Sequence, residues 1–131
     1  MMRALLPVMI LLSQILAPLA FEGDIVDTVC ALFKSANTKE IGKNLSSSVE
    51  MTVNGEEDVY SKAQAEQILR EFFTKNTPLN SSIVHRIDTN PRYRFGVLAL
   101  GTKTGKYRVA VTLKKTANVF LITELRIEPD K

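Results

Sequence analysis

The sequence contains little of what specialised sites require. Its 131 residues include one cysteine, one histidine and no tryptophan. A single cysteine cannot form an internal disulfide, and one histidine without clustered cysteines does not make a zinc-type centre. No phosphate-binding glycine loop and no catalytic-triad spacing is present. We therefore predict neither a metal nor a cofactor.

The composition is that of an ordinary globular domain. Hydrophobic residues make up 45% of the chain and charged residues 24%, with only 6 Gly and 5 Pro. These proportions exclude a disordered chain, a collagen-like repeat and a disulfide scaffold. They exclude no class of chemistry.

The first twenty residues have the composition of a secretory signal peptide. Arg3 is followed by an almost wholly apolar stretch over residues 4–16 and then by small residues. A membrane anchor is the alternative, but the apolar run is shorter than the roughly 20 residues that span a bilayer, and prolines interrupt it. We predict that residues 1–20 are a signal peptide cleaved after Ala20, with Ala17 as the alternative position. The protein is then secreted or periplasmic, with no membrane span after cleavage.

The remaining residues, 21–131, suffice for one domain with one core. Their charge is uneven, because residues 21–71 contain 5 Lys/Arg against 10 Asp/Glu, whereas residues 72–131 contain 11 against 4. A basic half favours anionic partners such as acidic glycans, lipid headgroups or a carboxylate ligand, or it is a solvated strand face that discourages edge pairing. Nucleic acid would need stacking aromatics beside the arginines, and only Phe120 is there, so we predict no nucleic-acid partner.

Apolar residues at helical spacing predict three helices. The first begins after an N-cap at Asp24, and the second begins at Thr38 and is ended by the serine run 46–48. The third begins with a capping box at Ser61 and runs to about Thr74. Their core-facing residues are Ile25, Val26, Val29, Leu32 and Phe33 in the first helix, Ile41 and Leu45 in the second, and Ala65, Ile68, Leu69, Phe72 and Phe73 in the third.

Alternation of apolar and polar residues predicts the strands. A short hairpin turning at residues 54–55 precedes the third helix. Four longer strands follow at residues 81–88, 93–102, 106–115 and 119–128. Short turns between them require an antiparallel meander. The predicted fold is an α+β domain in the order α-α-β-β-α-β-β-β-β, with the three helices of the N-terminal half on one face of a curved antiparallel sheet.

Two stretches of the sequence carry a family resemblance. Residues 59–69, VYSKAQAEQIL, at the strand-to-helix junction and residues 125–128, LRIE, near the end resemble small secreted bacterial proteins called domain of unknown function 4783. The resemblance covers nearly all of residues 21–131. It implies a fold similar to nuclear transport factor 2, in the cystatin-like superfamily, and no assigned activity. That superfamily includes isomerases, dehydratases and non-catalytic binding modules, so it implies no catalytic residues here.

Alternation in the four long strands predicts that His85 faces the helices as the one titratable side chain of an apolar surface. The candidate pocket residues are Tyr60, Phe72, His85, Tyr93, Phe95 and Tyr107. In an enzyme, His85 would act as the general base, with Tyr93, Tyr107 or Tyr60 as hydrogen-bond donor. Isomerases of the fold class that the resemblance implies use a carboxylate base, and no inward position of these strands carries Asp or Glu. The alternative is a core histidine, because a lone His between two isoleucines is more often hydrogen-bonded to the backbone or to a tyrosine.

The same alternation points a second set of residues away from the helices, with an apolar centre bordered mainly by arginine. These candidate interface residues are Arg94, Leu98, Leu100, Arg108, Phe120, Ile122 and Arg126. An exposed apolar centre predicts burial against a second copy or another protein. The alternative is a bulge at Gly96 that switches the faces, and Leu98 and Leu100 are then core residues.

The sequence favours an exported, non-enzymatic binding or interaction module. Its sheet face would form a homodimer or bind another protein, and its cavity would bind a small apolar or anionic ligand. The alternative is a small isomerase or hydratase with a pocket at His85. An enzyme needs open volume and a polar partner beside His85, whereas a binding module can have its interior filled by Phe72, Phe73 and Phe95.

Overall fold

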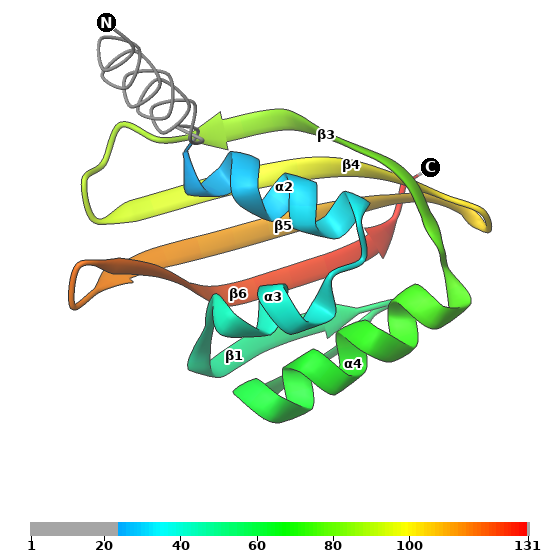
Figure 1. Cartoon of the computed structure of the whole chain (residues 1–131), viewed down its shortest axis with the longest axis horizontal. Helices are drawn as coiled ribbons and strands as arrows, with labels where there is room; N and C mark the ends of the chain where they lie inside the picture. The colour runs from blue at the N-terminus through cyan, green and yellow to red at the C-terminus, as the bar shows by residue number, and fades with distance from the viewer. Residues whose placement is uncertain (1–23, 131) are drawn as a thin grey trace, which may run out of the picture.

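A computed structural model describes residues 24–130 as three helices and six strands (Figure 1). They are α2 (Ile25–Lys34), α3 (Thr38–Lys43), β1 (Leu45–Val53), β2 (Glu56–Ser61), α4 (Lys62–Lys75), β3 (Pro78–Ile87), β4 (Tyr93–Thr102), β5 (Gly105–Thr116) and β6 (Val119–Pro129). This order confirms the predicted α+β fold. None of the helices between residues 24 and 130 has the length and apolarity to cross a membrane. The predicted signal peptide lies outside the described residues.

Side-chain caps determine where the two longer helices begin. The Asp24 carboxylate accepts a hydrogen bond from the Val26 amide, while Asp27 accepts one from the Asp24 amide, which forms a capping box at the start of α2. Ser61 and Gln64 form the same box at the start of α4. Each box supplies acceptors for amides that have no partner within the helix, so both helices begin where the sequence predicts.

The six strands form one sheet in the order β2-β1-β6-β5-β4-β3. Strands β3 to β6 are the predicted antiparallel meander, but β1 pairs with β6 in parallel, so the sheet is mixed rather than antiparallel throughout. The parallel pairing begins at Leu45, opposite Ile122. Leu45 and the serine run 46–48 therefore belong to β1, and α3 ends earlier than predicted, at Lys43.

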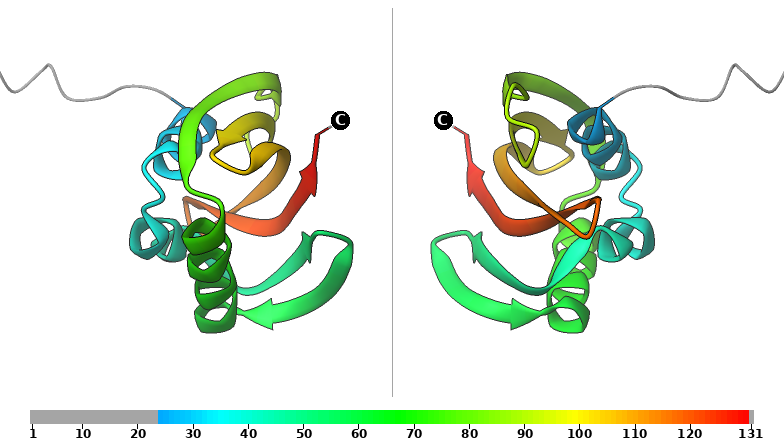
Figure 2. Two further views of the ribbon diagram at one scale, coloured as in Figure 1. Left: turned by 90° about the vertical axis from the view of Figure 1, so that its right-hand side faces the viewer. Right: turned by 90° about the vertical axis from the view of Figure 1, so that its left-hand side faces the viewer.

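The helices lie along one face of the curved sheet (Figure 2). Helix α2 packs on β3 and β4, α4 packs on β1 and β2, and α3 contacts both other helices. Between the helices and the sheet, the rings of Phe72 and Phe33 each meet the ring of Phe73 edge-on, with centroids 5.6 Å apart. Nothing among residues 24–130 covers the opposite face of the sheet, which we call the open face.

The predicted faces of β4 are reversed. Gly96, Leu98 and Leu100 point to the helices and are buried, whereas Phe95 and Val97 lie on the open face and are half-buried. The register of β4 against β5 is continuous, so no bulge at Gly96 causes the reversal. Both alternating sets of β4 are apolar, and the pattern alone therefore could not choose between them.

Bulges reverse parts of β3 and β6. In β3 the register shifts between Ile83 and His85, so Ile83 faces the helices while His85 lies opposite Val97 on the open face. In β6 the register against β5 shifts at Thr123, which has no partner on β5. Because of this extra residue, Ile122 and Leu125 both face the core although they are three positions apart. The predicted outward orientation of Ile122 is wrong for this reason.

Candidate functional site

The structure divides the predicted pocket residues between the two faces of the sheet. Tyr60, Phe72 and Tyr107 lie on the helix side, and His85, Tyr93 and Phe95 lie on the open face. The sheet separates the two groups, so the six residues do not line one cavity.

Buried Asn76, which no sequence pattern indicates, joins α4 to β5 on the helix side. Its Oδ1 accepts hydrogen bonds from the Tyr107 hydroxyl at 3.1 Å and from the Thr104 hydroxyl. Its Nδ2 donates to the Phe72 carbonyl at 2.9 Å. The Tyr107 ring also packs edge-on against the Phe72 ring, with centroids 5.0 Å apart. Three hydrogen bonds satisfy most of the amide's capacity, so Asn76 fastens these elements together.

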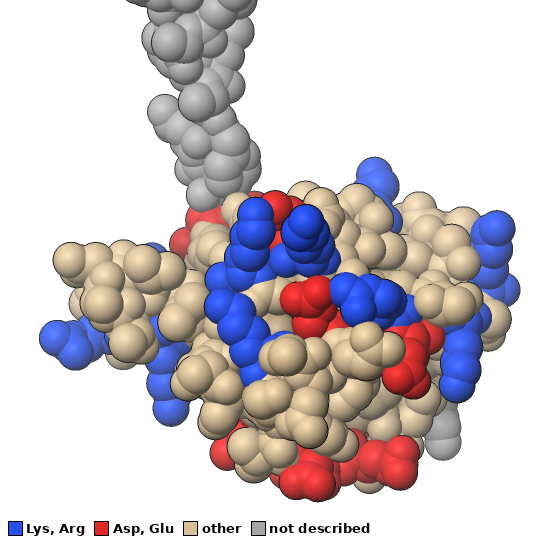
Figure 3. All heavy atoms as spheres, turned by 60° about the horizontal axis from the view of Figure 1, so that its bottom comes forward, with Lys and Arg blue, Asp and Glu red and all other residues tan. Residues whose placement is uncertain are grey.

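A cleft of about 280 Å³ lies beside this junction, between α4 and the β1–β2 hairpin. Val53, Tyr60, Ile68 and Phe72 form its apolar lining, and Asn54, Glu56, Glu71, Lys75 and Asn76 its polar lining. Figure 3, in which this side of the molecule comes forward, shows Lys and Arg interspersed with Asp and Glu, and acidic side chains along the lower margin. Two carboxylates and one ammonium line the cleft, so its charge does not favour an anionic ligand.

His85 is exposed on the open face, where its ring meets the Phe95 ring edge-on with centroids 6.2 Å apart. Tyr107 lies on the other side of the sheet, and the hydrogen bonds among residues 24–130 connect neither Tyr93 nor Tyr107 to His85. The prediction of an internal His85 pocket is therefore wrong. The bulge in β3 turns this side chain to the outside.

The open face has an apolar centre, but not the predicted one. Leu98, Leu100 and Ile122 are at most 1% exposed and belong to the core, so they cannot form an external surface. Half-buried residues of the three neighbouring strands take their place: Phe95, Val97 and Ala99 from β4, Ala110 and Thr112 from β5, and Leu121 from β6. Arg108 and Arg126 border this centre on the open face, as predicted.

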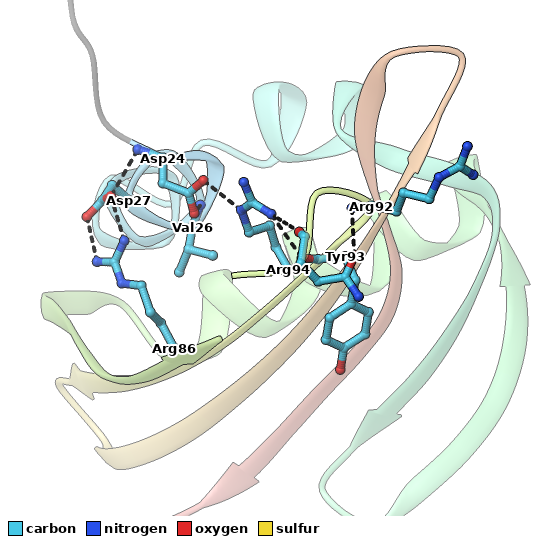
Figure 4. A network of polar contacts seen from close by, with 8 residues as sticks. Asp24, Val26, Asp27, Arg86, Arg92, Tyr93 and Arg94 are labelled. Atoms are coloured by element: carbon cyan, nitrogen blue, oxygen red, sulfur yellow. Dashed lines mark hydrogen bonds and ion pairs between the residues drawn. The ribbon is translucent and has the colours of Figure 1, made fainter. Parts of the chain in front are cut away.

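Arg94 lies on the helix side, where it forms an ion pair with the N-cap of α2 instead of facing a partner protein. Its Nε donates to the Asp24 carboxylate at 2.9 Å, and Nη1 donates to the Asn90 carbonyl (Figure 4). Its guanidinium also lies 4.6 Å above the centre of the Phe120 ring. Both Arg94 and Phe120, predicted as interface residues, are thus engaged within the domain.

A second ion pair fastens the same end of α2 to β3. The Arg86 guanidinium donates two hydrogen bonds to the Asp27 carboxylate, each 2.9 Å long (Figure 4). This two-point geometry matches the planar fork of arginine to the two carboxylate oxygens. Arg86 reaches α2 because its side chain lies on the helix side after the β3 bulge, opposite Gly96.

The Asp27 ion pair makes stability depend on pH. Hydrogen bonds from Arg86 hold the pKa of Asp27 below its usual value of 3.8. Because the folded-state pKa is the lower one, the stabilisation is complete well above pH 3.8 and is lost as the pH falls through the folded-state pKa. For this partly exposed pair we expect Asp27→Asn to cost about 0.2–1 kcal/mol at neutral pH and nothing in strong acid, measured by urea unfolding at several pH values.

Asparagine at this position keeps an oxygen for the α2 capping box, so the substitution spares the cap while it removes the charge and one of the two oxygens that accept from Arg86. Glu57→Gln on the exposed part of β2 is the matched control and should show no such pH dependence. A difference between wild type and Asp27→Asn that stays constant from neutral to acid pH would contradict this assignment.

The comparison with known proteins agrees with this architecture. The model of the family called domain of unknown function 4783 (DUF4783) matches residues 26–128. The chain belongs to this family. No curated protein matches the sequence of this DUF4783 domain.

Solved structures also resemble this DUF4783 domain. A DUF4783 family protein from Bacteroides ovatus is 29% identical, with a TM-score of 0.75 over 79% of this chain and 93% of that one. Another from Bacteroides uniformis is 23% identical, with a TM-score of 0.78 over 82% and 99% of the two chains. A domain of unknown function with a cystatin-like fold from Nostoc punctiforme has 7% identity and a TM-score of 0.62, over 78% of this chain and 70% of that one. The family match confirms the predicted family. A further structure, whose name contains NTF2, is 12% identical with a TM-score of 0.60 over 79% of this chain and 92% of that one, and it confirms the predicted fold similar to nuclear transport factor 2.

Proposed function

We propose that this domain is an exported, non-enzymatic interaction module that pairs with a second copy through its open face. The observation that carries the proposal is the apolar centre of that face, made by Phe95, Val97 and Ala99 with their neighbours on β5 and β6. A sheet covered on one side by helices normally places polar residues on its other side. A contiguous apolar centre on the uncovered side instead favours burial against a partner.

Charges around this centre favour a second copy as the partner. Strands β5 and β6 place Arg108 and Arg126 on the open face, and β6 and β1 place Glu124 and Glu50 there, side by side. A two-fold interface brings one surface against itself, so each basic group of one copy can meet an acidic group of the other. The open face meets this requirement, because it has positive and negative charges at its border and apolar residues at its centre.

The interior of the domain supports a non-enzymatic role. The rings of Phe33, Phe72 and Phe73 fill the space between the helices and the sheet. The single histidine is exposed on the open face. The predicted isomerase or hydratase pocket needs His85 in a concave site, and the filled interior with His85 outside it does not provide that combination.

Export rests on the first twenty residues, whose single arginine, apolar stretch and small residues have the pattern of a signal peptide. In an envelope or extracellular compartment, a domain with a single cysteine relies on packing rather than on an internal disulfide. The extensive core is consistent with this requirement.

Sedimentation equilibrium of residues 21–131 across the micromolar range tests the proposal. We expect a reversible dimer and, for Val97→Glu, dissociation that is at least about tenfold easier, because the new carboxylate would be buried in the apolar centre. Leu79→Glu is the matched control, because Leu79 is 56% exposed at the start of the edge strand β3. A wild-type protein that stays monomeric throughout, or equal weakening by both substitutions, would overturn the proposal.

A further inference from the structure

We infer that the cleft between the β3–β4 and β5–β6 turns binds the phosphate group of a small phosphate ester. This cleft, of about 350 Å³, is lined by Pro91, Arg92, Lys115, Ala117 and Asn118. It shares no lining residue with the apolar centre of the open face, so the inference does not depend on self-association.

No ion pair among the described residues neutralises the two cations of the cleft. Among residues 24–130, neither Arg92 nor Lys115 takes part in an ion pair, and no carboxylate lines the cleft. Figure 4 shows the Arg92 side chain pointing away from the ion pairs of Asp24 and Asp27. Two unpaired cations in one concavity create a positive potential that attracts an anion. The cleft beside α4 differs, because acidic groups line it as well.

Backbone hydrogen bonds hold the walls of the cleft in place before any ligand binds. The Lys115 amide donates to the Arg92 carbonyl at 2.9 Å and so joins the two turns. The Arg92 amide donates to the Asn90 side chain at 2.8 Å, and Arg94 donates to the Asn90 carbonyl. These bonds fix the backbone of both turns, which lowers the backbone part of the conformational entropy lost on binding.

The opposite wall is equally restricted. Ala117 and Asn118 have φ values of 51° and 68°, the left-handed geometry of a tight hairpin turn. The Lys115 ammonium lies 5.5 Å from the centre of the Phe120 ring, which keeps it beside the turn. The two cations therefore approach a bound group from two fixed walls.

This donor set fits a phosphate monoester better than a carboxylate. A phosphate monoester carries about −1.5 to −2 charge at neutral pH and several strong acceptor oxygens, whereas a carboxylate carries one charge. The Arg92 guanidinium can donate two hydrogen bonds, the Lys115 ammonium supplies a second charge, and the Asn118 amide is a neutral donor. Two positive charges balance the dianion.

Titration with glycerol 3-phosphate, followed by the amide resonances of residues 21–131, tests the inference. We expect saturable chemical-shift changes of the amides of residues 92 and 115–118. The double substitution Arg92→Gln and Lys115→Gln should weaken binding at least about tenfold, because it removes the charge-assisted hydrogen bonds. Lys103→Gln with Lys106→Gln is the matched control, because it removes the same charge from the β4–β5 turn and the start of β5. Circular dichroism checks that both variants fold.

A second experiment, vesicle sedimentation, distinguishes a soluble phosphate ester from a lipid headgroup as the ligand. Vesicles of phosphatidylcholine with and without phosphatidic acid are sedimented with the wild type and with both double variants. Binding that requires phosphatidic acid and the cleft residues supports the site with a lipid as its source, and binding to glycerol 3-phosphate alone supports a soluble ester. No saturable shift in either arm, equal weakening by both double variants, or acetate bound as tightly as glycerol 3-phosphate would overturn the inference.

Discussion

Replacing Leu98 by alanine should lower the free energy of unfolding by about 2–5 kcal/mol, the range for a fully buried leucine whose removal leaves a cavity. Leu98 is 0% exposed and lies opposite Ile83 on β3 and Val109 on β5, below the helices. The sheet backbone on both sides restricts collapse of the cavity, so the cost should be well above the transfer free energy alone. Urea unfolding of residues 21–131, with a check that the m-value is unchanged, gives the number.

Leu121→Ala is the matched control, because it deletes the same side chain from the open face, where Leu121 is half-buried opposite Lys114. At concentrations below any self-association, we expect it to cost about 1 kcal/mol or less. A larger cost for Leu121→Ala than for Leu98→Ala would mean that the two faces of the sheet are assigned the wrong way round.

Local signals in the sequence were enough to predict the order of the elements. The predicted N-cap at Asp24, the capping box at Ser61 and the apolar stripe of α4 each depend on residues close together in the sequence, and the structure contains all three. Short turns between the long alternating stretches leave the antiparallel meander as the only pairing. These features need no knowledge of distant contacts, which is why the order of the elements could be predicted. The family was predicted separately, from the resemblance of residues 59–69 and 125–128.

The faces of the strands could not be predicted in the same way. In β4 the set with Phe95 and Val97 and the set with Leu98 and Leu100 are both apolar, and the choice depends on the helix that covers one of them. The bulge before His85 has no local signature in the sequence, yet it turns the histidine outward. A one-residue error of register exchanges every inward and outward side chain, so the predicted pocket and interface failed together.

Long-range contacts account for the remaining omissions. Asn76 is recognisable only once Tyr107 and Thr104 are seen to converge on its side chain. The predicted interface residue Arg94 instead pairs with Asp24, seventy positions earlier in the chain. The parallel pairing of β1 with β6 likewise joins segments that are far apart in the sequence. Candidate site residues are therefore harder to predict here than the fold that positions them.

Gly96→Ala should destabilise the domain by about 1–3 kcal/mol, because it forces an extra methyl group into a packed contact. An alanine Cβ at this position would lie 2.6 Å from Cγ1 of Val26 in α2, which is closer than two non-bonded carbon atoms approach each other in proteins. Val26 is buried and β-branched, so it cannot easily rotate away, and α2 must shift from the sheet instead. Such a shift also strains the ion pairs that Asp24 and Asp27 make with β4 and β3.

Two comparisons make this expectation specific to the contact between α2 and β4. Gly101→Ala, later in β4 on the open face, meets only the side chain of exposed Asn80 and should change stability by less than about 0.5 kcal/mol. In a Val26→Ala background, which removes the crowding methyl groups, Gly96→Ala should cost little, so a double-mutant cycle measured by urea unfolding should show strong coupling. If the cost of Gly96→Ala is the same in both backgrounds, close packing of α2 against β4 is not the reason for glycine at this position.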